Sequence, residues 1–144
     1  MHKLKEILLK YPGLGLIPTV NKFFTALGVD TKIYFFDDKD RYFKYQGEEL
    51  SKGIDIKDSD NSDFPVIPLK FDCALNTEEN SIIMFFKGTK VYRYDISSEK
   101  LESGYTDGKD IKDEFGEDIK NIDAAVLFEG DYYLFKKQQI KIFE

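Results

Sequence analysis

A threefold internal repeat constrains this 144-residue chain more than any other feature. Each copy begins with a short, mostly apolar stretch that carries Asn21, Asp72 or Asp123 as its second residue. These three residues are evenly spaced, because 21 to 72 and 72 to 123 are both intervals of 51 residues. Repeats of this length are typical of proteins that place one supersecondary unit beside the next. The spacing predicts a single domain, 1–144, with repeats at about 20–70, 71–121, and 122–144 together with 1–19.

Each copy continues with two aromatic strands that are separated by a polar turn. The composition supports strands, because the chain has 13 Phe and 9 Tyr, residues that pack well on a pleated surface. The recurrence of the pattern carries more weight than strict alternation, which is absent. The sequence therefore predicts an all-β fold with short helices. The paired strands are expected at 33–36 and 42–45, at 83–86 and 91–94, and at 132–135 and 140–143.

The segments between repeats, about 25 residues each, have room for a fourth strand and a short helix. Ile111, Phe115 and Ile119 are spaced as one face of a helix, whereas residues 55–70 contain two prolines and are expected as loop or extended chain. A second helical stripe lies near the N-terminus, before Pro12-Gly13. We expect residues 1–19 to supply the outer part of the last repeat. The stripe consists of Leu4, Ile7, Leu8 and Tyr11.

Several runs of residues resemble the hemopexin repeat. The family's Ile-Asp-Ala-Ala run is resembled by Phe71-Asp72-Cys73-Ala74-Leu75 and by Ile122-Asp123-Ala124-Ala125. Its Phe-Phe-Lys-Gly and Tyr-Trp-Arg-Tyr-Asp runs are resembled by Phe85-Phe86-Lys87-Gly88 and Tyr92-Arg93-Tyr94-Asp95. The resemblance implies a β-propeller in which each repeat is one blade.

The number of blades stays open at this point. The family usually has four blades, often closed by a disulfide, whereas this chain has three repeats and one cysteine. A three-bladed ring closed by the N-terminal segment, a fragment of a larger propeller, and a homo-oligomer that completes its ring between chains are all compatible with the sequence.

The resemblance also suggests where an ion would bind. In such propellers the first strand of each blade lines a central channel, which implies that Asn21, Asp72 and Asp123 could hold a calcium or sodium ion there. The residues themselves favour a structural role, in which the side chains accept hydrogen bonds from local backbone amides. A second acidic run, Asp58–Asp63, lacks the Gly and the Glu of a calcium loop and is expected to be a solvated loop.

Charge and composition exclude several classes of function. The net charge of −6 disfavours nucleic acid and anionic membrane surfaces as partners. The sole histidine is His2, so neither a histidine-based site nor an activated Cys73 is expected, and we predict no enzymatic activity. No apolar run is long enough to span a bilayer, and residues 1–20 lack the pattern of a signal peptide. We therefore expect a soluble protein, either cytoplasmic or exported without a cleaved signal.

The functional prediction is a non-catalytic binding module that recognises a protein or glycan partner through its loops and surface. An alternative is a binder of ions or of polyamine-like cations in an acidic channel, since the chain is negatively charged. The resemblance adds a third alternative, an accessory domain of a bacterial toxin.

Overall fold

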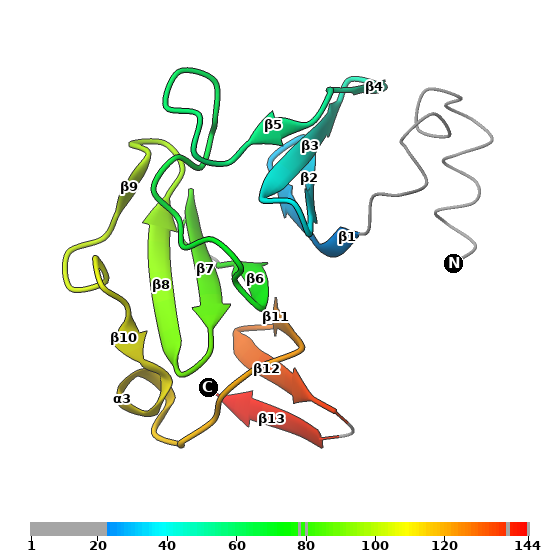
Figure 1. The fold of residues 1–144 in the computed structure, drawn as a ribbon. Helices are drawn as coiled ribbons and strands as arrows, with labels where there is room; N and C mark the ends of the chain where they lie inside the picture. The colour runs from blue at the N-terminus through cyan, green and yellow to red at the C-terminus, as the bar shows by residue number, and fades with distance from the viewer. Residues whose placement is uncertain (1–22, 78, 80, 138, 144) are drawn as a thin grey trace.

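The computed structural model describes residues 23–77, 79, 81–137 and 139–143. These residues form three antiparallel sheets, which follow one another along the chain (Figure 1). The described part contains one α-helix, so the predicted all-β class with short helices is confirmed. The predicted N-terminal helical stripe lies outside the described residues.

The first sheet is made of five strands. Strands β1, β2 and β3 form a meander, and the short strands β4 and β5 both pair with β3. Residues 56–72 then lead to the second sheet and contain turns, as the two prolines predicted. The strands are β1 (Phe23–Val29), β2 (Lys32–Asp37), β3 (Arg41–Gln46), β4 (Glu49–Leu50) and β5 (Ile54–Asp55).

The second sheet repeats this plan, and the third sheet repeats its first three strands. The helix α3 (Ile111–Phe115) follows the second sheet and ends where Gly116 adopts a left-handed φ of 81°. It is shorter than the predicted stripe, so that Ile119 lies beyond it. The strands are β6 (Cys73–Asn76), β7 (Ile82–Lys87), β8 (Lys90–Asp95), β9 (Lys100–Leu101), β10 (Lys109–Asp110), β11 (Ala124–Phe128), β12 (Asp131–Lys136) and β13 (Gln139–Phe143).

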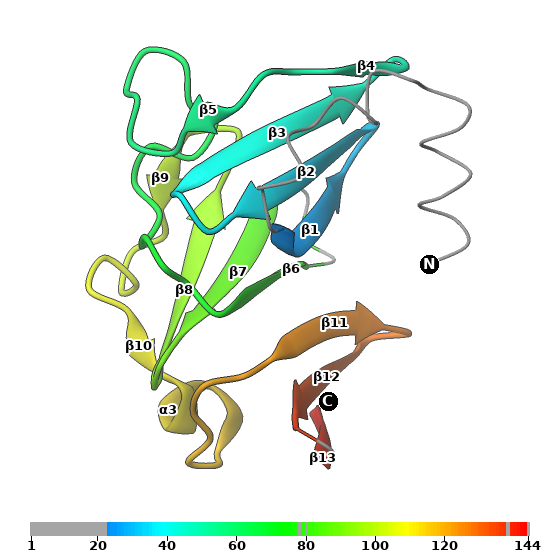
Figure 2. The same ribbon diagram turned by 45° about the vertical axis from the view of Figure 1, so that its right-hand side comes forward.

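The first strands of the three sheets lie next to one another in space. Strand β1 packs against β6, and β6 packs against β11 (Figure 2). The second sheet therefore has a neighbour on each face, whereas the described residues do not close the three sheets into a ring. The propeller therefore remains a prediction.

The strand register shows which residues of the three sheets are equivalent. Thr25, Cys73 and Ala124 pair with Phe36, Phe86 and Phe135, the last phenylalanine of each second strand. We call the face of a sheet that bears these phenylalanines its trailing face, because in the first two sheets it packs against the next sheet. The opposite face, which bears Phe35, Phe85 or Leu134, is called the leading face.

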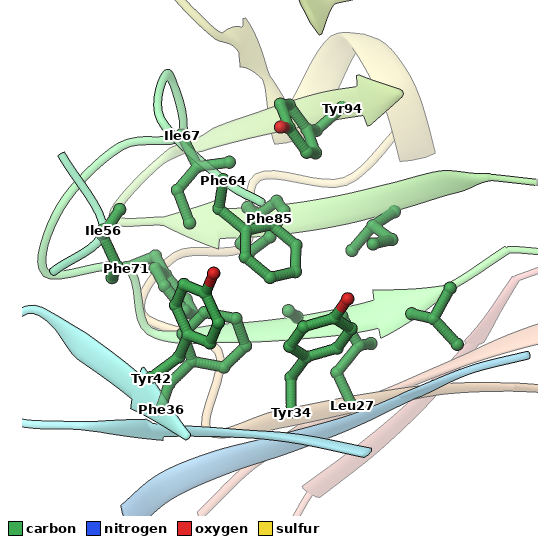
Figure 3. Close-up of a cluster of buried hydrophobic side chains, with 13 residues drawn as sticks. Leu27, Tyr34, Phe36, Tyr42, Ile56, Phe64, Ile67, Phe71, Phe85 and Tyr94 are labelled. Atoms are coloured by element: carbon green, nitrogen blue, oxygen red, sulfur yellow. The ribbon is translucent and has the colours of Figure 1, made fainter. Parts of the chain in front are cut away.

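An aromatic cluster fills the space between the first and second sheets (Figure 3). Its centre is Phe64, which comes from the connector between these sheets and is 0% exposed. The ring of Phe64 lies 4.8 Å from that of Tyr34 and 5.7 Å from that of Tyr94, measured between centroids, with edge-on and tilted geometries typical of buried rings. Phe64 therefore contacts the trailing face of one sheet and the leading face of the next.

A partly buried polar junction fixes this connector. The Tyr34 hydroxyl donates to Asp63 Oδ2 at 2.8 Å, and the Tyr94 hydroxyl donates to the Asp63 carbonyl at 2.5 Å. The Tyr42 hydroxyl accepts from the Asp63 backbone N–H at 2.8 Å. Burial, together with the Asp63 carboxylate, raises the pKa of Tyr34 well above its usual value. Three strands are thus held to one residue of the connector, and the hydroxyls remain satisfied inside the core.

At the second interface, which lies between the second and third sheets, an aromatic residue of the connector again packs between the two sheets. Phe115 of α3 stacks on Phe86 of the second sheet, with 6.0 Å between ring centroids. It also contacts Tyr132 and Phe143 of the third sheet, at 5.6 and 5.2 Å between centroids. Equal burial of Phe86 and Phe135 would follow from the repeat, yet Phe86 is fully buried and Phe135 only half-buried. The difference arises because no described element covers the trailing face of the third sheet.

We predict that Phe64→Ala lowers the free energy of unfolding by about 3–5 kcal/mol, because it removes a ring that contacts both sheets. Val66→Ala is the matched control in the same connector, since Val66 is 44% exposed and should change the stability by less than about 1 kcal/mol. Urea denaturation followed by circular dichroism measures both changes. Similar losses for the two variants would contradict the central role of Phe64.

Candidate functional site

The predicted site residues Asp72 and Asp123 perform the same structural task in their respective sheets. The carboxylate of Asp72 accepts a hydrogen bond from the Gly88 N–H at 2.7 Å, in the turn between β7 and β8. That of Asp123 accepts from the Lys137 N–H at 2.6 Å, in the turn between β12 and β13. Each carboxylate therefore ties the first strand of its sheet to the hairpin formed by the other two.

The third predicted residue, Asn21, lies outside the described residues, and the strand register gives its place in the repeat to another residue. Because Thr25 is equivalent to Cys73 and Ala124, the residue that matches Asp72 and Asp123 is Phe24. The sequence alignment of the first repeat is therefore displaced by three residues. The alignment was displaced because β1 has Phe24, and neither Asp nor Asn, at the position of Asp72 and Asp123.

In the first sheet, another carboxylate stabilises the equivalent turn. Asp37, at the end of β2, accepts hydrogen bonds from the backbone N–H groups of Lys39 and Arg41 at 2.9 and 3.0 Å. Its second oxygen pairs with the Arg41 guanidinium at 2.9 Å. Every sheet thus has a carboxylate at this hairpin, although it comes from a different strand in the first sheet.

Strands β1, β6 and β11 line a hollow of about 260 Å³. Each of β1, β6 and β11 contributes three consecutive residues to its wall, and these residues are equivalent by register. Asn76 is the only polar side chain among them, and its Nδ2 donates to the Gly28 carbonyl at 2.8 Å. The wall carries no carboxylate, so a cation there would depend on backbone oxygens. The lining residues are Ala26, Leu27, Gly28, Ala74, Leu75, Asn76, Ala125, Val126 and Leu127.

Acidic side chains do not gather into a metal site in the described part of the chain. No group of three or more His, Cys, Asp or Glu residues suited to a metal ion is found among those residues. The Asp58 carboxylate is hydrogen-bonded within its own loop. It accepts hydrogen bonds from the backbone N–H groups of Asp60 and Asn61, and a third from the Asn61 side-chain amide at 2.9 Å. The Asp58 carboxylate thus forms an Asx turn that stabilises its own loop.

Cys73 is buried at the start of β6, within the second interface. Burial raises the pKa of its thiol to about 12, and the negative charges of Asp72 and Asp123 contribute in the same direction. The thiolate is therefore disfavoured at neutral pH, and the thiol acts as a small apolar group.

The trailing face of the third sheet is an exposed apolar surface. Val126, Ile140 and Ile142 are 45%, 57% and 57% exposed. Tyr133 and Phe135 lie between them on the central strand β12, and both are half-buried. The sequence contained a signal for this surface, since β11 and β13 carry apolar residues on both faces, but sequence alone does not tell which face is covered. We call Val126, Tyr133, Phe135, Ile140 and Ile142 the apolar face.

We predict that Asp72→Ala destabilises the protein by about 1–2 kcal/mol, because the Gly88 N–H loses a charged acceptor. Asp72→Asn should lose less, since the amide retains an acceptor oxygen. Thermal unfolding in calcium chloride and in a chelator measures both variants. Because the carboxylate is engaged by an amide, the loss should be equal in the two solutions; a loss confined to calcium would instead make Asp72 an ion ligand.

The Cys73 thiol should not react with a disulfide reagent at about pH 8 while the protein is folded, because its pKa is raised. In denaturant it should react at the rate of a free cysteine. Absorbance of the released thiolate measures the two rates. Rapid reaction of the native protein would contradict the buried position of the thiol.

Comparisons with known proteins identify the fold and leave the family undetermined. Neither a protein-family model nor a curated protein sequence matches the chain. Within the described residues, no helix has the length and apolar character needed to cross a membrane.

Similar solved structures include several plant proteins. They include the hemopexin fold protein CP4 from cow pea (TM-score 0.70, 20% identity, 94% of this chain and 66% of that chain covered). A 2S albumin seed protein from Dolichos has the same TM-score and identity, with 94% and 67% covered. A plant lectin with two metal-binding sites from Cicer arietinum has a TM-score of 0.73 at 18% identity, with 94% and 66% covered. The chain thus spans about two thirds of these proteins and has an all-β fold like theirs.

Proposed function

We propose that the chain is a non-catalytic binding module whose apolar face binds an apolar surface of a protein partner. The proposal rests on one observation: equivalent positions are buried in the first and second sheets and exposed in the third. Tyr42 and Val91 are fully buried, whereas their equivalent Ile140 is 57% exposed. A sheet face of this composition in contact with water is typical of an interaction surface.

A substitution within the repeat supports the same proposal. The trailing faces of the first two sheets carry Lys44 and Arg93 at equivalent positions, paired with the carboxylates of Asp63 and Glu102. The third sheet has Ile142 at this position. An interface position that carries a charged pair in each of the first two sheets is therefore apolar where the partner would bind. Burial of an isoleucine contributes about 1.5–3 kcal/mol, which favours a complementary apolar surface over a glycan.

The chain offers a sharp test of the apolar face. We predict that the double variant Ile140→Gln and Ile142→Gln loses at least about tenfold in affinity for the partner, because about 1.4 kcal/mol corresponds to a factor of ten. Lys141→Gln is the matched control, since Lys141 lies between them in sequence but on the other face of β13. Affinity purification from the native source, quantified by mass spectrometry, compares the two variants with the wild type.

Two outcomes would count against this function. Equal recovery of the same proteins by all three forms would show that the apolar face is not the binding surface. Binding to a glycan array that neither isoleucine substitution changes would favour a glycan partner and a different surface. Sedimentation of the purified wild type distinguishes a second copy of the chain from a foreign partner.

The hollow beside β1, β6 and β11 supports a second candidate, binding of a cation or small molecule. The specific observation is that equivalent residues of three strands line a hollow of about 260 Å³. Its uncharged wall gives no support to a polyamine, which requires carboxylates. Native mass spectrometry with calcium, sodium and spermine would detect such a ligand, and a bound ion should persist in Asp72→Ala because that carboxylate does not line the hollow.

A further inference from the structure

Short outer strands cover one edge of the first two sheets. Strands β4 and β5 pair with β3, and β9 and β10 pair with β8, on the side away from the central strand (Figure 1). The equivalent strand of the third sheet is β13, and within the described residues only β12 pairs with it. The outer edge of β13 therefore presents backbone groups that its counterparts use for strand pairing.

The register shows which backbone groups of β13 point to this edge. In the first sheet, Ser51 donates its N–H to the Lys44 carbonyl at 2.8 Å. In the second, Glu102 donates its N–H to the Arg93 carbonyl at 2.9 Å. Ile142 is equivalent to Lys44 and Arg93, so its N–H and C=O point to the outer edge as theirs do.

The outer strands of the first two sheets place a leucine at the same position. Leu50 of β4 lies opposite Tyr45, and Leu101 of β9 lies opposite Tyr94. The equivalent residue of β13 is Phe143, which is also aromatic. A leucine on an added strand would therefore lie beside an aromatic ring in the third sheet too.

The residue after each leucine binds the third strand in one of two ways. The Ser51 hydroxyl oxygen accepts from the Lys44 N–H at 2.8 Å, so that both bonds of Ser51 use the backbone of Lys44. The Glu102 carboxylate accepts instead from the Arg93 guanidinium at 2.6 Å. Ile142 offers no cation to a carboxylate, but its N–H and C=O can form both of the bonds that Ser51 forms. The edge of β13 therefore fits the pair Leu-Ser.

A second copy of the chain fits this edge less well. Strand β13 has five residues, with Lys141 at its centre, whereas β4 and β9 have two residues each. Antiparallel pairing of two β13 strands in full register would place Lys141 opposite its own copy. Like charges at directly opposed positions destabilise a sheet.

We propose that the outer edge of β13 binds an extended segment of a partner protein as an added antiparallel strand, with a leucine opposite Phe143 and a serine beside Ile142. Main-chain hydrogen bonds supply affinity in this mode, and the side-chain contacts supply specificity. The surface is the edge of the third sheet and not its apolar face. The inference therefore goes beyond the proposed function and does not rest on it.

A tethered copy of such a segment tests the edge. Residues 47–53, Gly-Glu-Glu-Leu-Ser-Lys-Gly, are appended directly after Glu144, because the register gives position 144 the place of Gln46. The tether gives the segment a high effective concentration at the edge. Residue-resolved hydrogen exchange by NMR should show the Ile142 amide exchanging at least about tenfold more slowly than in the unextended chain.

The matched control is the same extension with proline in place of its serine. Proline has no N–H to donate and lacks the hydroxyl, so this extension should leave the exchange rate of the Ile142 amide unchanged. The free heptapeptide, added to the unextended chain, tests binding between separate molecules. It should shift the Ile142 amide resonance, and the proline peptide should not.

Four results would overturn the inference. An Ile142 amide that exchanges as slowly in the unextended chain as the Leu134 amide of the central strand would show that the edge is already covered. An unchanged rate in the extended chain would show that the edge does not accept a strand. Equal protection by the proline extension would show that backbone pairing is not the cause. Protection in the unextended chain that falls on dilution, together with a dimer in sedimentation, would assign the edge to a second copy.

The double variant Ile140→Gln and Ile142→Gln separates this inference from the proposed function. Combined with the extension, it should keep the amide at position 142 protected, because strand pairing uses the backbone and not the substituted side chains. Loss of that protection would count against backbone pairing. The edge can thus fail its test while the apolar face passes its own, and the reverse also holds.

Discussion

The packing of one connector aromatic ring between two sheets is the interaction on which the described structure depends. Each sheet has apolar side chains on both faces, so a single sheet of this kind would expose an apolar surface on at least one side. Phe64 and Phe115 resolve this problem at successive interfaces, because each contacts the trailing face of one sheet and the leading face of the next. The chain is held together without a disulfide, and the described part relies on this repeated packing.

The polar groups of the core follow from the same arrangement. Tyr34, Tyr42 and Tyr94 are apolar enough to pack around Phe64, yet each has a hydroxyl that needs a partner once it is buried. Asp63, the residue before Phe64, supplies all three partners through its carboxylate, carbonyl and N–H. The connector therefore provides both the ring and the hydrogen bonds, which fixes its position more firmly than packing alone would.

The open surfaces lie where this pattern ends within the described residues. The third sheet is open on its trailing face, and the first sheet is partly open on its leading face, where Phe23 is 37% exposed and Phe43 is buried, while the second sheet is covered on both. These two surfaces differ in character, because the apolar face of the third sheet carries Ile142 where its counterparts carry Lys44 and Arg93 in ion pairs. A surface that had merely lost a neighbouring sheet would be expected to keep the paired basic residue, which is why we propose binding at the third sheet.

The repeat, the all-β class, the paired strands of each copy and the short helix near Ile111 could be predicted from the sequence. Local recurrence and apolar spacing are sufficient for these features, because neither depends on which segments pack together. Sequence by itself misplaced the first strand of the first repeat, where Phe24 replaces the expected polar residue and only hydrogen bonding to β2 fixes the register. It also left the role of Asp72 and Asp123 undecided, because a carboxylate that holds a turn and one that holds an ion look alike in a linear sequence; the tertiary structure shows both bonded to turn amides. Which faces are buried was decided only by the tertiary structure, since burial depends on neighbours that are about 50 residues away in the chain.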